Sequence, residues 1–437
     1  MSARTRAVWL ALALLLPASP GEAADPAWVE GLEAGAEAAR AGDLAAASDE
    51  LAAARALAGK GGPPNGDPRY WTLLEDLGQV LAWTGQAPAA LAPLQEALRL
   101  REAALPADDP DLAGARLALA RIEAGAGAKN AAHGLAQAAL AGLEAGLGAD
   151  HPATAPARFL LADLALDAGD STTARRLAEA AFLTRTSRLG ADHPATVESA
   201  AQVARIEAAA GDAAAARARL EALLPLLDSL PPTARAAVTL PLARLRAGEN
   251  DGAAERLLEG LFDGIGDEPA APGEVPAPLL KAQAANEAGV LLTEAGAYDR
   301  ALPWLERGLD LKARALGKDG PALAPPLLNL AELRLRQGEP EAADGPIARA
   351  ERILQDARLA ESPAFAPVLE LRASQRAQEG RFREAVLALE GAMTLRDPAD
   401  PALPLDLEAY ATLLDALARF EDADRARERL RGLRGKE

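Results

Sequence analysis

Histidine is the residue type in this sequence best suited to acid–base chemistry or metal binding, and the chain contains only three: His133, His151 and His193. His151 and His193 stand 42 residues apart, each between an aspartate and a proline. A catalytic or metal site needs side chains that converge on one point, whereas these two occupy equivalent places in separate copies of one motif. We therefore expect Asp150 and Asp192 to cap the following helices, each with a proline in the first turn, and His133 to be exposed.

Other catalytic motifs are missing as well. The chain has no cysteine, which excludes a thiol nucleophile, a disulfide and a lipid-modified N-terminal cysteine. It also lacks the Gly-x-Ser-x-Gly, Walker-type and zinc-protease patterns. Glycine-rich stretches such as residues 125–127 fall at turns between helices rather than after a strand, which argues against phosphate binding. The sequence thus predicts no catalytic residue, no metal site, no cofactor and no enzymatic activity.

The composition indicates a helical protein. Of the 437 residues, 50% are hydrophobic but only 3% are aromatic, which leaves too few β-forming residues for a set of strands. Alanine, leucine, arginine and glutamate dominate, and all four favour helices. The 46 basic and 64 acidic residues give a net charge of −18, so nucleic acids and anionic membranes are unfavourable partners.

The first 23 residues have the pattern of a secretory signal peptide. Two arginines precede a short apolar run at residues 7–16, and Gly21 and Ala23 place small side chains at a cleavage site. The run is too short to span a bilayer comfortably. We expect cleavage after residue 23, with retention as an anchor as the alternative. The sequence therefore predicts an exported protein, periplasmic or secreted, without membrane insertion after cleavage.

An internal repeat of 42 residues runs along the rest of the chain. Residues 120–124 recur at 204–208, and residues 147–154 recur at 189–196. Glycines with nearly the same spacing, which we expect at turns, are Gly42, Gly85, Gly127, Gly169, Gly211, Gly248, Gly296, Gly338 and Gly380. Ala418 takes this place in a tenth, degenerate unit. A fixed period of this length is typical of stacked supersecondary units.

Small residues flank each predicted turn. An alanine follows every turn glycine by five residues, and a small residue precedes nearly every one by seven. Two helices that pack at 8–10 Å need small residues where their backbones approach most closely, so each unit is predicted to be a helical hairpin. Pro241 is the exception at the preceding place, and we expect it to distort or shorten its helix.

These features resemble tetratricopeptide repeats. The 42-residue period and the Leu-Gly-x-Asp-His-Pro-x-Thr loop at residues 147–154 and 189–196 look like the kinesin-light-chain type. The resemblance covers residues 27–437. It implies an all-α fold, a right-handed α-solenoid of about 9–10 helical hairpins with a concave and a convex surface.

The expected organisation has five parts. Residues 1–23 are the signal peptide and residues 24–60 an N-terminal helical hairpin. Residues 68–263 form a first arm of repeats, and residues 264–278 form a loop. Residues 279–437 form a second arm that ends in a polar capping helix.

The resemblance also suggests where a partner binds. In tetratricopeptide proteins, peptide ligands lie against the first helices of the hairpins, often held by asparagine side chains. Counted back from the turn glycine, Gln202 and Asn329 stand nine residues upstream, Asn286 ten and Arg205 six. Carboxamides can both donate to and accept from a peptide backbone, so these four residues are the candidate partner-binding residues.

The place six residues before the turn carries Arg121, Asp163 and Arg205 in three consecutive repeats. On stacked helices these side chains could form an ion-pair ladder that joins the repeats, which we expect to contribute little stability if it is exposed. Alternatively, the two arginines could bind a carboxylate of a ligand.

The sequence therefore predicts a non-catalytic scaffold or adaptor that binds a peptide segment or a partner protein in its concave groove. The alternative is a chaperone-like assembly factor of the cell envelope. The low aromatic content argues against that alternative, because grooves that capture unfolded clients usually offer large apolar anchors. The identity of the partner and any self-association are left open.

Overall fold

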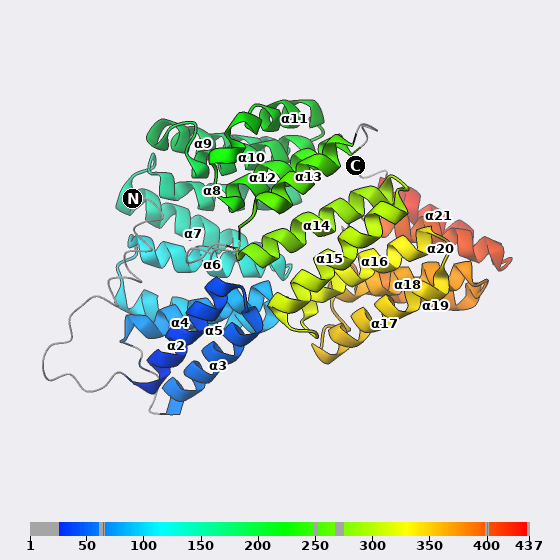
Figure 1. The fold of residues 1–437 in the computed structure, drawn as a ribbon, viewed down its shortest axis with the longest axis horizontal. Helices are drawn as coiled ribbons and strands as arrows, with labels where there is room; N and C mark the ends of the chain where they lie inside the picture. The colour runs from blue at the N-terminus through cyan, green and yellow to red at the C-terminus, as the bar shows by residue number, and fades with distance from the viewer. Residues whose placement is uncertain are drawn as a thin grey trace, which may run out of the picture. The chain divides into compact units, whose positions relative to one another are not determined.

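The structure, a computed structural model, describes residues 26–60, 64, 66–247, 252–266, 275–397, 400 and 402–434 (Figure 1). Within these ranges the chain forms helices, turns and loops, with no strand. This confirms the predicted all-α fold. The predicted signal peptide, the turn at Gly248 and the centre of the 264–278 loop lie outside the described residues.

Within the described residues, consecutive helices form ten hairpins, each with a first and a second helix. The first five are α2 (Ala27–Ala41) with α3 (Leu44–Lys60), α4 (Pro68–Trp83) with α5 (Ala87–Ala104), α6 (Pro110–Gly125) with α7 (Lys129–Leu147), α8 (Ala155–Asp167) with α9 (Ser171–Leu189), and α10 (Pro194–Ala209) with α11 (Ala213–Glu221). The other five are α12 (Pro232–Arg246) with α13 (Ala253–Gly264), α14 (Ala277–Glu294) with α15 (Tyr298–Leu316), α16 (Ala324–Arg336) with α17 (Pro340–Asp356), α18 (Ala366–Gln378) with α19 (Phe382–Leu395), and α20 (Leu403–Ala416) with α21 (Phe420–Arg434).

The hairpin turns lie where the glycine spacing predicts them. Every predicted turn glycine in the described residues has a positive φ, between 73° and 90°, a conformation that glycine adopts without a steric penalty. In the tenth hairpin Ala418 adopts φ 56°, so the turn is kept although its residue is not glycine. The degenerate tenth unit is thereby confirmed.

The small residues lie between the two helices of each hairpin. A Cβ atom added to Gly78 would lie 2.5 Å from Cγ of Leu94, and one added to Gly35 would lie 2.6 Å from Cγ of Leu51. The alanines five residues after the turns are all buried, namely Ala47, Ala90, Ala132, Ala174, Ala216, Ala253, Ala301, Ala343 and Ala385. Close helix packing therefore explains the small-residue pattern.

Pro241 does not shorten its helix, which was one of the two effects expected of it. Helix α12 passes through Pro241 and continues to Arg246, over 15 residues. A proline removes one backbone hydrogen bond and crowds the preceding turn. Val238 and Leu242 on either side are fully buried, and such packing can hold a helix together across this local defect.

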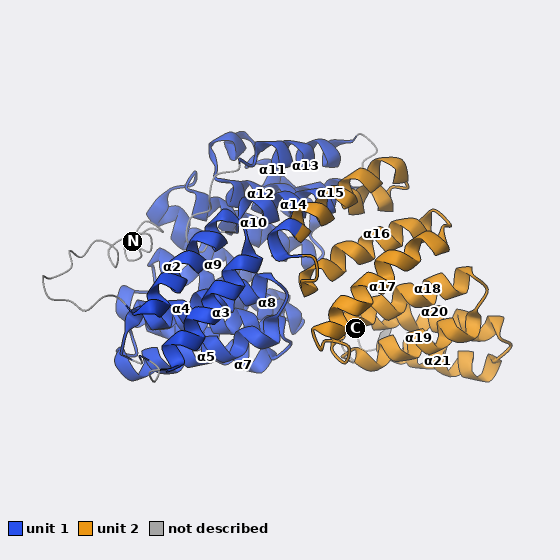
Figure 2. Ribbon diagram, turned by 60° about the horizontal axis from the view of Figure 1, so that its bottom comes forward, with its two compact units in different colours: residues 1–287, 314–317 blue, residues 288–313, 318–437 orange. Residues whose placement is uncertain are grey.

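The chain divides into two compact units (Figure 2). Unit 1 comprises residues 1–287 and 314–317, and unit 2 comprises residues 288–313 and 318–437. Within unit 1 each first helix contacts the first helix of the next hairpin, whereas second helices chiefly contact the first helices beside them. First helices therefore line the inner, concave side and second helices the outer side. The five-part organisation stays a prediction.

In unit 1 the first hairpin also meets a distant part of the chain. A Cβ atom added to Gly42, in the turn between α2 and α3, would lie 2.9 Å from Cγ of Pro278 at the start of α14. One added to Gly317 would lie 3.6 Å from Cβ of Ala45. Pro278 and Gly317 of unit 1 thus contact the first hairpin of the same unit, and we call this contact the clasp.

Candidate functional site

The structure brings two of the predicted partner-binding residues together on α10. The Arg205 Nε–H donates to Oε1 of Gln202 at 3.0 Å, and the Arg205 guanidinium forms an ion pair with Asp163 of α8. Gln202 is half-buried and Arg205 is exposed. The inner face of unit 1 therefore carries a polar cluster of a carboxamide, a cation and an anion from adjacent hairpins.

The ion pair between Asp163 and Arg205 is one contact of the ladder expected from the 42-residue spacing. Burial raises the pKa of the Asp163 carboxyl, although the charges of Arg205 and Arg121 act in the opposite direction. Desolvation thus outweighs the attraction. Because both side chains of the pair are more than a third exposed, the pair adds little to stability, and it holds the two side chains in place.

A second inner-face residue, Asp76, was not among the predicted site residues. It lies on α4, nine residues before Gly85, the place that Gln202 takes on α10. The pKa of its carboxyl is raised to about 7, chiefly by burial and also by the charge of the nearby Glu75, while Arg40 opposes the shift. Its repeat position was the signal that could have identified it. The inner face therefore contains a carboxyl group that titrates near neutral pH.

Asn286 lies half-buried on α14, in unit 1. Its neighbour Glu287 is buried and forms an ion pair with Arg244 of α12, with Nη2 donating to Oε2 at 2.7 Å. This pair joins two first helices, as the pair between Asp163 and Arg205 does. Asn286 thus stands beside a structural contact between hairpins.

Asn329 lies half-buried on α16, in unit 2. It belongs to a different compact unit from Gln202, Arg205 and Asn286. Gln202 and Arg205 are in direct contact through their hydrogen bond. The assignment of these four residues to partner binding stays a prediction.

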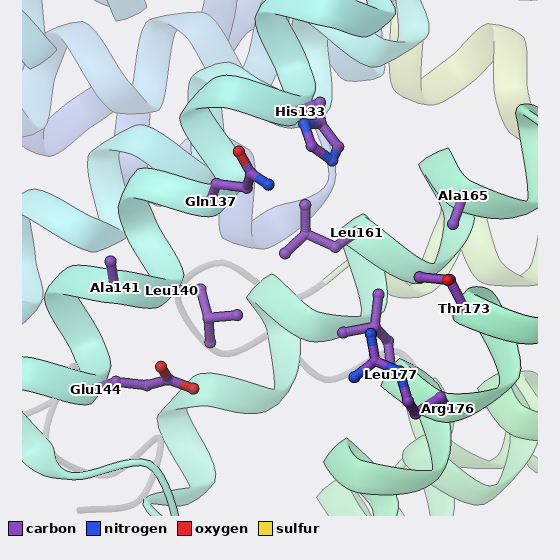
Figure 3. A pocket seen from close by; sticks show the side chains of 10 residues that line it. All are labelled: His133, Gln137, Leu140, Ala141, Glu144, Leu161, Ala165, Thr173, Arg176 and Leu177. Atoms are coloured by element: carbon purple, nitrogen blue, oxygen red, sulfur yellow. The ribbon is translucent and has the colours of Figure 1, made fainter.

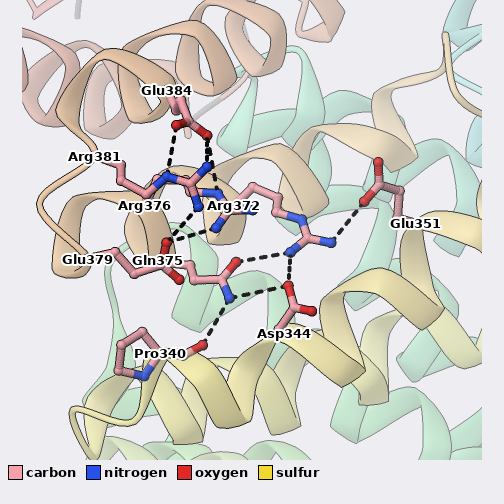
Figure 4. A network of polar contacts seen from close by, with 9 residues as sticks. All are labelled: Pro340, Asp344, Glu351, Arg372, Gln375, Arg376, Glu379, Arg381 and Glu384. Atoms are coloured by element: carbon pink, nitrogen blue, oxygen red, sulfur yellow. Dashed lines mark hydrogen bonds and ion pairs between the residues drawn. The ribbon is translucent and has the colours of Figure 1, made fainter.

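Unit 2 has a dense polar network between α17 and α18 (Figure 4). Arg372 forms ion pairs with Asp344 and, at 3.1 Å, with Glu351. Gln375, which is almost fully buried, donates to the backbone oxygen of Pro340 at 2.9 Å. These groups satisfy one another across the helix interface, so we assign them to the stability of unit 2 rather than to ligand binding.

The predicted helix caps need a correction. His151 and His193, rather than the aspartates before them, occupy the cap positions, and each Nδ1 accepts from the backbone N–H two residues later, at 3.2 and 3.1 Å. The cap must directly precede the proline of the first turn, and in Asp-His-Pro that residue is histidine. In Asp67-Pro and Asp109-Pro the aspartate does cap its helix. His133 is exposed, as expected.

The described ranges contain no cluster of three or more histidine or carboxylate side chains that could hold a metal ion. Nor does any helix in them have the length and apolar character needed to span a membrane.

Comparison with known proteins identifies the repeats. Tetratricopeptide-repeat family models match residues 72–111, 112–153 and 280–356. None of the curated proteins matches the chain.

Several solved structures are similar. A kinesin light chain from Podosopora anserina with nearly identical tetratricopeptide-like repeats is 20% identical over 48% of this chain and 98% of that one, with a TM-score of 0.42. BtubC from P. vanneervenii is 19% identical over 56% and 90%, with a TM-score of 0.40. A Rap protein complexed with competence and sporulation factor is 15% identical over 94% and 98%, with a TM-score of 0.45. The family models thus place tetratricopeptide repeats at residues 72–153 and 280–356 of this chain, and such repeats generally serve as scaffolds for protein interactions.

Proposed function

We propose that the protein is a non-catalytic scaffold that binds a peptide segment or partner protein on the concave surface of its repeats. The observation that carries this proposal is the polar cluster of Gln202, Arg205 and Asp163 on the inner face of unit 1. The carboxamide oxygen of Gln202 accepts from Arg205, while its N–H groups have no partner within the described residues. These N–H groups can donate to a peptide carbonyl oxygen.

The site of action in this proposal is the cell envelope or the exterior of the cell. The signal-like pattern of residues 1–23 supports export. The net charge of −18 makes protein surfaces better partners than nucleic acids or anionic lipids. A partner segment with a basic side chain would suit Asp76.

The test is affinity capture with residues 24–437 from envelope extract, read by mass spectrometry. Two double variants probe the surface, Gln202→Ala with Arg205→Ala, and Asn286→Ala with Asn329→Ala. Arg383→Ala is the matched control, since Arg383 is an exposed arginine on the second helix α19. One dominant partner that is lost with either double variant but kept with the control would support the scaffold.

Other outcomes contradict the proposal. Retention of the partner by both double variants would refute the site. Many weakly bound apolar clients, together with suppressed aggregation of unrelated proteins, would favour the chaperone-like assembly factor instead.

A further inference from the structure

The outer side of unit 1 contains a pocket of about 380 Å³ between the second helices α7 and α9 (Figure 3). Its floor is apolar and includes Leu140 of α7, Leu161 of α8 and Leu177 of α9. Its rim is polar, and Figure 3 shows Gln137 and Arg176 on opposite sides of it. The pocket lies on second helices and on the outer side of α8, so it is separate from the concave surface.

Two polar groups of the rim are not engaged by other described residues. Within the described part of the chain, neither Gln137 nor Arg176 makes a hydrogen bond or an ion pair. Arg176 lies near Asp170, whose pKa is lowered first by the backbone N–H of Thr173 and also by the charge of Arg176. Asp170 is already engaged as the cap of α9. The rim therefore offers an amide and a guanidinium to a ligand.

One repeat earlier, the equivalent place between α5 and α7 contains a hydrogen bond between two side chains. Gln95 stands 42 residues before Gln137 and donates to Oε1 of Glu123 of α6 at 3.5 Å. Glu123 stands 42 residues before Ala165. A carboxylate of the central helix thus accepts from a side chain of the outer helix.

One repeat later, the equivalent place between α9 and α11 contains ion pairs in place of the hydrogen bond. Glu207 stands 42 residues after Ala165 and pairs with Arg219 at 2.7 Å. Arg219 also pairs with Glu179 at 2.8 Å and lies over the ring of Phe182, with 5.6 Å to the centroid. This arginine takes the place of Leu177 in the repeat and covers the apolar floor.

Of these three equivalent places, the one between α7 and α9 alone lacks a carboxylate on its central helix, because Ala165 stands where the neighbouring repeats have Glu123 and Glu207. We infer that the pocket between α7 and α9 is a second docking site, for an extended peptide segment in which a glutamate or aspartate adjoins leucine-like side chains. The ligand carboxylate replaces the missing internal one and is bound by Gln137 and Arg176. The leucine side chains pack on Leu140 and Leu161.

Charge complementarity favours this occupant over other peptides. Arg176 is the cation of the rim, and the one carboxylate there, Glu144, pairs with Arg158 at 2.9 Å. A guanidinium binds a carboxylate more strongly than a neutral acceptor. The apolar floor adds affinity through burial of aliphatic surface.

The test uses the purified protein and three labelled, end-blocked heptapeptides, measured by fluorescence anisotropy. The parent contains Leu-Glu-Leu at its centre, and the controls contain Leu-Gln-Leu and Ser-Glu-Ser. We expect saturable binding of the parent, with a Kd of about 10–500 µM as is usual for a small anchored peptide, and about tenfold weaker binding of each control.

Two variants locate the site. Ala165→Glu restores the carboxylate of the neighbouring repeats, and we expect it to weaken parent binding at least about tenfold without lowering Tm. Arg176→Ala removes an exposed side chain without internal partners among the described residues, so it tests the site even if Ala165→Glu folds poorly. Ala342→Glu, at an exposed position of α17, controls for added charge.

Several results would overturn the inference. The first is an absence of saturable binding at peptide concentrations up to about 1 mM. The others are equal affinity for the Leu-Glu-Leu and Leu-Gln-Leu peptides, and unchanged affinity in Arg176→Ala. Loss of binding in the Asn286→Ala, Asn329→Ala variant would place the peptide on the concave surface and would equally refute the outer site. If the concave surface captures no partner, the result of this peptide-binding measurement is unaffected.

Discussion

At the scale of single residues, the capping histidine His151 makes its loop sensitive to pH. Its Nδ1 must be unprotonated to accept the backbone N–H of Ala153. Burial lowers the pKa of His151, and the charge of Arg188 lowers it further. The unfolded chain therefore binds this proton more readily than the folded one, so stability falls as the pH drops through about 6.5, the ordinary histidine value.

We predict that replacing this histidine, His151→Asn, weakens the acid sensitivity. Asparagine is a good helix cap whose side chain does not titrate. The difference between Tm at pH 7.5 and at pH 5.0 should shrink relative to the unaltered protein, as followed by circular dichroism. The variant His151→Ala with His193→Ala should instead lose about 0.5–2 kcal/mol per cap at pH 7.5. An unchanged pH difference in the asparagine variant would contradict the role of this cap.

Asp76 gives the opposite pH dependence. Its pKa is raised from 3.8 to about 7, so the folded state keeps a proton that the unfolded chain releases. The contribution of Asp76 to stability is therefore present at pH 4 and is lost as the pH rises towards 7. We predict that Asp76→Asn raises Tm at pH 8 and changes it little at pH 4. Asp49→Asn, at an exposed position of α3, is the control and should show no such contrast.

At the scale of helices, α7 contains glycines with opposite roles. A Cβ atom added to Gly146 would lie 2.2 Å from the backbone oxygen of Asp108, in the loop before α6, whereas one added to Gly134 meets no described atom within 4 Å. The first glycine permits a close approach of loop and helix, and the second only lowers helix propensity.

We predict that Gly146→Ala and Gly134→Ala have opposite effects on the free energy of unfolding. Gly146→Ala should destabilise by about 1–3 kcal/mol, because the loop must shift. Gly134→Ala should stabilise by about 0.5–1 kcal/mol through helix propensity. Urea unfolding of the two variants provides the comparison. Equal effects of the same sign would show that the loop does not pack on α7 as described.

The hairpins themselves could be predicted from sequence because their determinants are local and periodic. Gly78 and Ala90, on either side of the turn at Gly85, pack where the period places them. The outer pocket was not predicted, because it arises from a difference between repeats. Ala165 is unremarkable alone and becomes informative only beside Glu123 and Glu207. The histidine caps were not predicted, because the aspartate before each histidine is one of the residue types that most often cap helices.

At the scale of the whole molecule, export and the concave surface remain proposals that need separate tests. We predict that the protein found outside the cytoplasm begins at Ala24, because small residues precede it at the cleavage positions. Intact mass spectrometry of the exported protein checks this. Ala23→Arg should block cleavage and leave a heavier, membrane-associated form. Recovery of the protein solely from the cytoplasm with residues 1–23 intact would contradict export.

The clasp changes how unit 1 should unfold. In an open array of repeats each hairpin touches only its neighbours, so the terminal hairpins fray first and independently. Gly42 and Pro278 are 236 residues apart yet in contact, which means that closing this loop costs chain entropy late in folding. Once the loop is closed, opening α2 and α3 also breaks their contact with α14. The amide hydrogens of the first hairpin should therefore exchange nearly as slowly as those of the central hairpins, although it is the first in the chain.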